Sequence, residues 1–164
     1  MIALVRVDNR LLHGQILEAW APRLGTREVV VADDDAARSP LARAAMTLCV
    51  PPEMPARVVT LGEVDWMALA ADPRPILVLL RDVEALARAR ARGLSAEMAR
   101  RVNLGNVHYE PGRRQITPSV FLTRDEIDTL LALALEGFEI EARAVPTEPP
   151  VGPAEMERRY GAGR

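Results

Sequence analysis

The sequence predicts an α/β protein: a three-layer, open twisted sheet of about seven mainly parallel strands, with helices on both faces. Strand-like and helix-like patterns alternate along most of the chain. The strand-like runs are rich in valine and have apolar neighbours on both sides, which is typical of a buried parallel sheet. A length of 164 residues suits one domain with a substantial core.

The first two thirds of the chain show this alternation most regularly. Gly25, Gly62 and Gly93 fall at or near the expected element boundaries, where turns and helix ends favour glycine. We expect strands at residues 2–7, 28–32, 57–60, 76–80 and 101–104, and helices at residues 15–24, 35–49, 64–70 and 83–92.

The pattern changes after residue 104. Residues 107–109 and 115–116, separated by a Pro-Gly turn at 111–112, indicate a short hairpin or meander. Thr123 and Glu126 have the spacing of a capping box, so a helix is expected to begin there and to run to Leu135.

The end of the chain is expected to differ from the rest. Residues 138–145 form a last expected strand, and from Pro146 onward the sequence is rich in proline, glycine and glutamate. This composition predicts a flexible C-terminal tail at residues 147–164, after a domain of residues 1–146.

Composition excludes several function classes. A net charge of −2 and an aromatic content of 4% argue against general nucleic-acid binding. All 21 basic residues are arginine, which excludes Schiff-base chemistry and a phosphate-loop lysine. Two histidines and one cysteine, far apart, do not have zinc-site spacing. We therefore expect neither a metal nor a bound cofactor.

The sequence also bears on the compartment. It contains no apolar run of membrane-spanning length and no pattern of a signal peptide. Its single cysteine, Cys49, permits no internal disulfide, which fits a reducing cytoplasm. Because Cys49 ends an apolar helical pattern, we expect it to be a buried core residue.

The most informative segment is residues 8–15, Asp-Asn-Arg-Leu-Leu-His-Gly-Gln. It lies between an expected strand and an expected helix, where open α/β folds place their chemistry. Here Asp8 could accept a hydrogen bond from one imidazole nitrogen of His13, which would fix the tautomer and leave the other nitrogen nucleophilic. A neutral imidazole of this kind can attack phosphorus.

The residues after His13 would suit a phosphoryl group. Gly14, Gln15 and Ile16 are expected to open a helix, and their amides would be free donors for an anion. Arg10 could add a bidentate guanidinium contact to the same anion. A structural interpretation also fits these residues: His13 would cap the helix or pack in the loop, and Arg10 would pair with Asp8.

Other polar positions are weaker candidates. Asp33 and Asp34 end the second strand and are expected to be solvated or to cap a helix, and Asp33 is our candidate for a site border. Gly105 follows a strand and could let the backbone approach a ligand, so it is a second border candidate. His108 lies in a strand-like context, for which we expect a structural role.

Residues 8–15, followed by Trp20, resemble the phosphorylation-site signature of the IIB component of the mannose/fructose/sorbose class of the bacterial sugar phosphotransferase system. The family pattern reads Asp-Asp-Arg-Leu-Ile-His-Gly-Gln-Val and then Trp. Supporting similarities are residues 29–34, the Pro-Pro pair at 51–52, and residues 102–108. Asn9 departs from the family pattern, which usually has an acidic residue at this position.

The resemblance implies roles for the loop residues. His13 would accept a phosphoryl group from the phosphohistidine of a IIA protein or domain and pass it to a sugar held by the membrane components IIC and IID. Arg10 would stabilise the transferring group and Asp8 would match the first Asp of the motif. No cofactor is implied. The location would be cytoplasmic, with access to the inner face of the membrane through IIC and IID.

Three functions remain compatible with the sequence. A transport phosphotransferase and a regulatory phosphorelay protein would both use the same loop, and adjacent IIC and IID genes would favour transport. A non-catalytic α/β binding module would show no acid-labile phosphorylation. The oligomeric state is left open.

Overall fold

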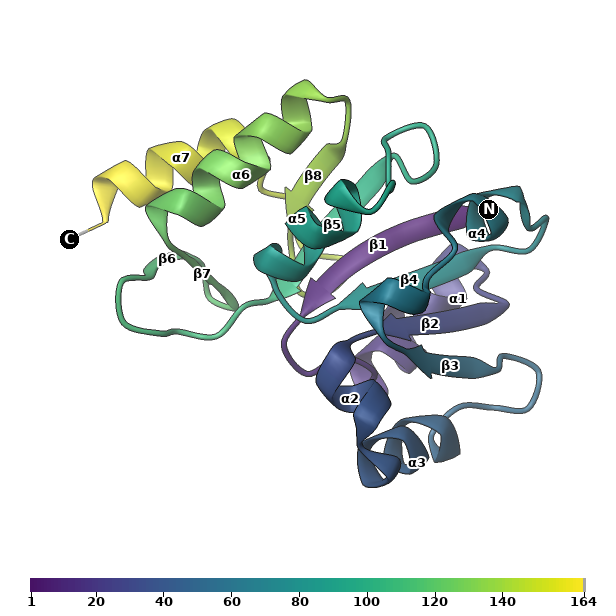
Figure 1. Cartoon of the computed structure of the whole chain (residues 1–164). Coiled ribbons are helices and arrows are strands. Elements are labelled where there is room, and N and C mark those ends of the chain that lie inside the picture. The colour runs from purple at the N-terminus through teal and green to yellow at the C-terminus, as the bar shows by residue number, and fades with distance from the viewer. Residues whose placement is uncertain (164) are drawn as a thin grey trace.

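Six parallel strands form the central sheet of the computed structural model, which describes residues 1–163. Their order is β3-β2-β4-β1-β5-β8, and two further strands, β6 and β7, pair as a separate antiparallel hairpin (Figure 1). The α/β class and the parallel sheet are therefore confirmed, with six strands in the main sheet instead of about seven. The strands are β1 (Ile2–Asp8), β2 (Glu28–Ala32), β3 (Ala56–Val59), β4 (Ile76–Leu80), β5 (Arg101–Asn106), β6 (Arg114–Thr117), β7 (Val120–Leu122) and β8 (Glu139–Ala142).

Helices connect the strands and cover the sheet. They are the π-helix η1 (Ile16–Trp20), α1 (Ala21–Leu24), α2 (Asp34–Arg38), α3 (Pro40–Leu48), the 3-10 helix η2 (Leu61–Glu63), α4 (Trp66–Ala71), α5 (Val83–Ala91), α6 (Arg124–Leu135) and α7 (Pro153–Ala162). Among the described residues, none of these helices combines the length and the hydrophobicity needed to cross a bilayer.

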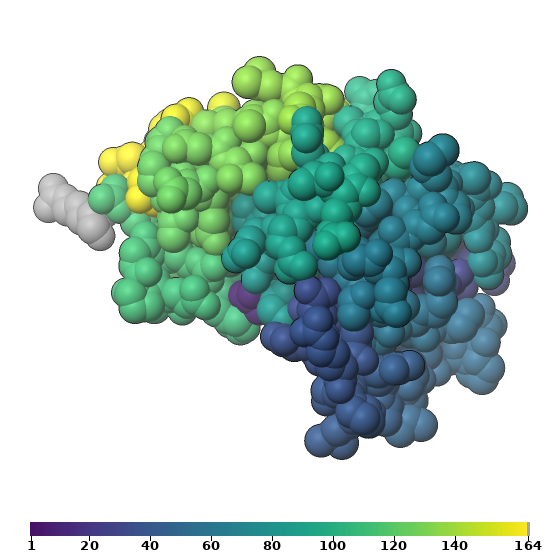
Figure 2. Space-filling view, in the orientation of Figure 1, coloured from purple at the N-terminus to yellow at the C-terminus, as the bar shows by residue number. Residues whose placement is uncertain are grey.

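Two apolar clusters lie on opposite faces of the sheet, as the alternation of side chains along a strand requires. Val5 and Val7 of β1 belong to the cluster covered by α4, α5, α6 and α7. Leu4 belongs to the other cluster, with Ile16 and Trp20 of η1. The three-layer arrangement predicted from the sequence is confirmed. In the view of Figure 2 little of the purple N-terminal segment is visible, because β1 lies inside the sheet and η1 and α1 lie on the other face.

The loops after β1 and β4 leave the sheet toward opposite faces. The chain leaves β1 through η1 on one face, and leaves the neighbouring β4 through α5 on the other. A crevice outside the carboxyl ends of two such strands is the usual binding place in open α/β folds. Residues 8–15 lie at this switch point.

One helix predicted over residues 35–49 is two helices. Ser39 caps the second helix by accepting a hydrogen bond from the Ala42 amide at 3.1 Å, and Pro40 occupies its first turn. This Ser-Pro pair is itself a helix-start signal. Cys49 is exposed, so its predicted burial was wrong: α3 itself has no fully buried residue, although Met46 and Val50 on either side of Cys49 pack against the core.

The C-terminal segment also differs from the prediction. Residues 147–164 were expected to be a flexible tail, yet residues 153–162 form α7, which packs against α6 (Figure 1). Met156 is 1% exposed and Val151 pairs with Ala142 of β8. Proline and glycine suggested disorder, but Pro153 is in the first turn of the helix, where its missing N–H costs nothing.

The hairpin was predicted too early in the chain. The Pro-Gly pair at 111–112 lies in an irregular connection, and the strands that pair are β6 and β7, joined through residues 118–119. Val107 makes only an isolated bridge to Val120. The capping box of Thr123 and Glu126 is present as predicted.

Candidate functional site

The loop after β1 is held by its apolar residues. The side chains of Leu11 and Leu12 are buried in the cluster beneath η1, which leaves His13 partly exposed at the surface. Leu11 has a φ of 57°, a left-handed conformation that is uncommon for a residue with a side chain. Its amide donates to the Asp8 carbonyl at 2.9 Å and closes a tight turn. Backbone strain of this kind is concentrated at functional sites.

His13 and Asp8 are in direct contact. Nε2 of His13 lies 3.1 Å from Oδ2 of Asp8, and the His13 side chain is 19% exposed while that of Asp8 is fully buried. A carboxylate acceptor places the proton of a neutral imidazole on Nε2. The Nδ1 atom then carries the lone pair, and it is the ring nitrogen available for chemistry.

Arg10 lies over the same carboxylate from the solvent side. Its Nε lies 3.3 Å from Asp8 Oδ1 and its Nη2 lies 3.1 Å from Gln15 Oε1, while its side chain remains 43% exposed. The pairing of Arg10 with Asp8, which the structural interpretation anticipated, is therefore present. It coexists with the His13 contact, because the carboxylate has acceptor capacity for both.

The Asp8 carboxylate is ionised despite its burial. Burial raises the pKa of Asp8, but the hydrogen bond from His13, the charge of Arg6 and the bonds from Arg10 outweigh it and hold the pKa at about 2. The Arg10 amide adds a hydrogen bond of 3.0 Å to Oδ1. The loop therefore surrounds a fixed negative charge with donors, which orients the imidazole.

The residues after His13 match the predicted anion site only in part. Gly14 is exposed and its missing side chain leaves open space, since a Cβ at this position would have Glu18 Oε1 as its nearest neighbour, at 4.0 Å. The Ile16 amide, predicted to be free, donates to the His13 carbonyl at 3.0 Å. The side chain of Gln15 is occupied as the partner of Arg10.

Sequence reasoning missed two buried polar residues beneath the loop. Arg6 of β1 and Asn103 of β5 are both fully buried and joined by a hydrogen bond of 2.6 Å from Arg6 Nη1 to Asn103 Oδ1. The sequence could have indicated them, because each is a polar residue in the middle of an apolar strand. A polar side chain that is buried there needs a hydrogen-bond partner. Arg6 Nη2 also donates to Asp8 Oδ2 at 2.9 Å.

Gly105 has a different neighbour from the one expected. A Cβ at this position would lie 1.9 Å from Cζ of Arg6. The glycine therefore makes room for the buried guanidinium, and this close approach to Arg6 replaces the predicted approach to a ligand.

Asp33 caps a helix, as one of the two predicted alternatives stated. Its Oδ1 accepts from the Ala36 amide at 2.8 Å, and both its oxygens pair with Arg81 at 2.7 Å. Burial raises the pKa of Asp33, but the Arg81 and Ala36 hydrogen bonds prevail and lower it overall. Asp33 follows β2, which β4 separates from β1, so it lies on the outer side, two strands away from the start of the histidine loop.

Asn9 connects this outer side to the loop. Its Nδ2 donates to the Arg81 carbonyl at 2.9 Å and its Oδ1 accepts from the His108 amide. The side chain thus bridges the connections after β4 and β5. His108 is exposed and takes part through its backbone, which agrees with the structural role expected for it.

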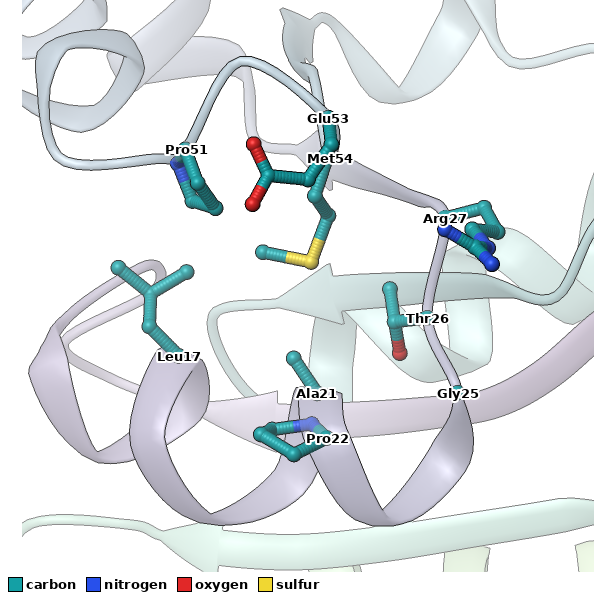
Figure 3. Close-up of a pocket in the computed structure, with 9 residues that line it drawn as sticks. All are labelled: Leu17, Ala21, Pro22, Gly25, Thr26, Arg27, Pro51, Glu53 and Met54. Atoms are coloured by element: carbon teal, nitrogen blue, oxygen red, sulfur yellow. The ribbon is translucent and has the colours of Figure 1, made fainter.

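A separate pocket of about 280 Å³ lies between the η1–α1 segment and the loop before β3 (Figure 3). Leu17 and Ala21 face Pro51 and Met54 across it. It contains none of Asp8, Arg10 and His13, so it is distinct from the histidine site.

Comparison with known proteins identifies the family. A family model described as the PTS system sorbose subfamily IIB component matches residues 2–157, a range that includes part of α7. The chain is 32% identical over 151 residues to N-acetylgalactosamine-specific phosphotransferase enzyme IIB component 2 of Escherichia coli, covering 92% of this chain and 94% of that protein. It is 27% identical to the mannose-specific EIIAB component of the same species, and covers 46% of that longer protein.

Solved structures share the fold. The ManXB structure from Thermoanaerobacter tengcongensis matches with a TM-score of 0.84 at 24% identity, covering 98% of this chain and 96% of that one. The IIB domain of the sorbose permease from Klebsiella pneumoniae matches with a TM-score of 0.83 at 23% identity, covering 96% of both chains. This chain therefore belongs to the sorbose subfamily of IIB components, the phosphotransferases of the sugar phosphotransferase system.

Proposed function

We propose that this protein is a phosphocarrier in which His13 accepts a phosphoryl group from a phosphorylated IIA protein or domain and passes it to a sugar. The observation that supports this most directly is the 3.1 Å contact between His13 Nε2 and Asp8 Oδ2, which leaves Nδ1 free at a partly exposed surface position. The family membership supplies the reaction class.

The first transfer uses the lone pair of His13 Nδ1. This nitrogen attacks the phosphorus of the donor phosphohistidine, a new N–P bond forms, and the electron pair of the old N–P bond returns to the donor ring. The imidazole ring of His13 gains positive character in the process, and the ionised Asp8 stabilises it through Nε2–H. The product is an Nδ1-phosphohistidine.

Arg10 and Gly14 serve the phosphoryl group. The exposed guanidinium of Arg10 is anchored by Asp8 and Gln15 beside the imidazole, so it can neutralise charge on the transferring oxygens with little reorganisation. Gly14 presents an open face with no side chain between the solvent and the backbone. In the second transfer a sugar hydroxyl oxygen forms the P–O bond, its proton passes to water or to a base beside the sugar, and the electron pair of the N–P bond returns to Nδ1.

The partners follow from the family. A IIA protein or domain donates the phosphoryl group, as the EIIAB name of the mannose-specific relative indicates for that protein. IIC and IID would hold the sugar at the membrane, so the protein would work in the cytoplasm and reach the inner face of the membrane through them. The sugar-specific names of the relatives favour transport over a purely regulatory phosphorelay.

The test is phosphorylation of the purified chain with phosphoenolpyruvate, Enzyme I, HPr and a cognate IIA, followed by intact mass before and after mild acid. We expect one acid-labile phosphoryl group in the wild type and in His108→Ala, and none in His13→Ala. His108 is the matched control because it is the other histidine and its side chain is exposed. No gain in mass beside a IIA that is itself phosphorylated would contradict the proposal.

A further inference from the structure

Arg6 is a fully buried arginine in the central strand of the sheet, directly beneath the histidine loop. It precedes Asp8 by two residues in β1, so both side chains emerge on the same face. Nη2 of Arg6 donates to Asp8 Oδ2 at 2.9 Å, and this is the oxygen that also lies 3.1 Å from His13 Nε2. One carboxylate oxygen thus joins a buried cation to the reactive ring.

The surroundings of Arg6 fit a guanidinium. Asn103, its register partner on β5, accepts from Nη1 at 2.6 Å. Gly105 supplies the space, because a Cβ there would lie 1.9 Å from Arg6 Cζ and 2.0 Å from Nη2. The ring of Trp20 covers the group, with Cζ 5.1 Å from the ring centroid, and the indole N–H is fixed by the Ala144 carbonyl at 2.9 Å.

Stability alone does not account for this arrangement. Burial disfavours the charged guanidinium and lowers the pKa of Arg6, although Asp8 opposes this. Its Nε has no hydrogen-bond partner within residues 1–163. Buried ion pairs are frequently no more stabilising than apolar residues of similar volume. What the ion pair does provide is a fixed position for the carboxylate.

We propose that Arg6 is a positioning residue for phosphoryl transfer: it holds Asp8 Oδ2 at the place that receives His13 Nε2–H, so that Nδ1 remains the nucleophile. This role rests on the proposed phosphocarrier function. Arg6 acts only through Asp8, because its side chain is 0% exposed and is separated from the phosphoryl position by the carboxylate and the ring. Arg10, which is exposed, would contact the phosphoryl group itself.

The first test reads the tautomer of His13 in the unphosphorylated protein by long-range ¹H–¹⁵N NMR. We expect the Nε2–H form in the wild type and a mixture of tautomers in Arg6→Met, in which Asp8 Oδ2 is free to turn toward Arg10. Phosphoryl acceptance from phospho-IIA should fall about 10- to 100-fold in Arg6→Met. Arg6→Lys keeps the charge, so it should restore part of the rate that Arg6→Met loses. The recovery should be incomplete, because lysine has no planar fork that reaches Asp8 and Asn103 together.

Arg113→Met is the matched control. The Arg113 side chain is 8% exposed and forms a two-point ion pair with Glu126 at 2.8 and 3.2 Å, in the C-terminal half of the chain. It removes an arginine of the same size whose partners, Glu126, Glu110 and the backbone carbonyl of His108, all lie outside residues 8–15. The control should keep the wild-type tautomer and rate, even if its melting temperature falls.

Gly105→Ala is a second variant, which keeps the proposal testable if Arg6→Met does not fold. It retains every charge but displaces the Arg6 guanidinium, so the tautomer should become mixed as in Arg6→Met. In the Arg6→Met background, Gly105→Ala should have little additional effect on the rate, because both act through the same group.

The outcomes separate this inference from the proposed function. If wild type is phosphorylated and Arg6→Met or Gly105→Ala shows the wild-type tautomer and a rate within about twofold of Arg113→Met, the role of Arg6 is overturned. If wild type takes no phosphoryl group, the phosphocarrier proposal fails by itself. The tautomer ratio would then still show whether Arg6 positions Asp8 against His13.

Discussion

Nδ2 of Asn9 lies 2.9 Å from the backbone carbonyl oxygen of Arg81, and this hydrogen bond ties the loop after β1 to the loop after β4. The same side chain accepts from the His108 amide after β5. Only a group that both donates and accepts satisfies these two partners, and an amide does so. Asn9 thereby joins three connections around the loop that carries His13.

Asn9→Asp should therefore destabilise the protein, although an acidic residue is usual in the family pattern. A carboxylate cannot donate to the Arg81 carbonyl and adds a negative charge next to Asp8. We expect a loss of about 1–2 kcal/mol in the free energy of unfolding, measured by urea denaturation, with His13 still phosphorylated. Asn9→Ala, which loses both hydrogen bonds, is the reference. An Asn9→Asp variant as stable as wild type would show that the Arg81 bond contributes nothing.

Asp8→Asn should be severely destabilising at neutral pH. It removes the anion that compensates the buried Arg6, whose side chain has no exposure to solvent. Removal of one partner of a buried ion pair typically costs about 3–5 kcal/mol. Chemical denaturation at pH 7 measures this loss, and a loss below about 1 kcal/mol would contradict the buried ion pair of Arg6 and Asp8.

The stability conferred by Asp8 should depend on pH in the acid range. Its folded pKa, about 2, lies below the ordinary value of 3.8, so the unfolded chain binds a proton first as the pH falls. The contribution, about 2 kcal/mol, is complete above pH ~4 and is lost progressively toward pH ~2. The difference in unfolding free energy between wild type and Asp8→Asn should therefore narrow by about 2 kcal/mol as the pH falls through this window. A constant difference between the two would disprove the low pKa.

Arg10→Ala should separate transfer from folding. The Arg10 side chain is 43% exposed and packs little, so the free energy of unfolding should change by less than about 1 kcal/mol. Transfer out of phospho-His13 should slow about 100-fold, because a donor to the phosphoryl oxygens is lost. Single-turnover transfer from the isolated phosphoprotein measures the rate. Wild-type transfer with unchanged melting would remove Arg10 from the mechanism.

Met156→Ala should destabilise the protein if α7 is part of the core. Met156 is 1% exposed, and its truncation leaves a cavity that costs about 2–4 kcal/mol. Ala154 is exposed on the same helix, so Ala154→Ser is a control that should leave the free energy of unfolding nearly unchanged. Equal melting of Met156→Ala and wild type is the result expected of a loose tail, and it would contradict the helix packing.

Much of the fold follows from the sequence because buried parallel strands have a distinctive apolar pattern. The expected strands at 28–32 and 76–80 have the same bounds as β2 and β4. The capping box at Thr123 and Glu126 marks the start of α6. The prediction of a flexible tail was wrong because it relied on composition and not on position. Pro153 was interpreted as a sign of disorder, although proline is favoured in the first turn of a helix.

The histidine loop was also predictable from the sequence, but the buried residues beneath it were not. Residues 8–15 indicate a site by their order along the chain. Arg6 and Asn103 become informative only when β1 and β5 are known to be neighbours, because their hydrogen bond joins residues 97 positions apart. The same holds for Gly105. A side chain at this position would clash with the Arg6 guanidinium of the adjacent strand, which only the structure shows.

The most direct test of the proposed mechanism is to locate the phosphoryl group on the protein after incubation with phosphoenolpyruvate, Enzyme I, HPr and a cognate IIA. Heteronuclear NMR of the phosphorylated chain distinguishes the two nitrogens of each histidine. We predict one phosphoryl group, on Nδ1 of His13, because Nε2 is engaged by Asp8. Phosphorylation on Nε2 of His13, or on His108, would contradict this mechanism.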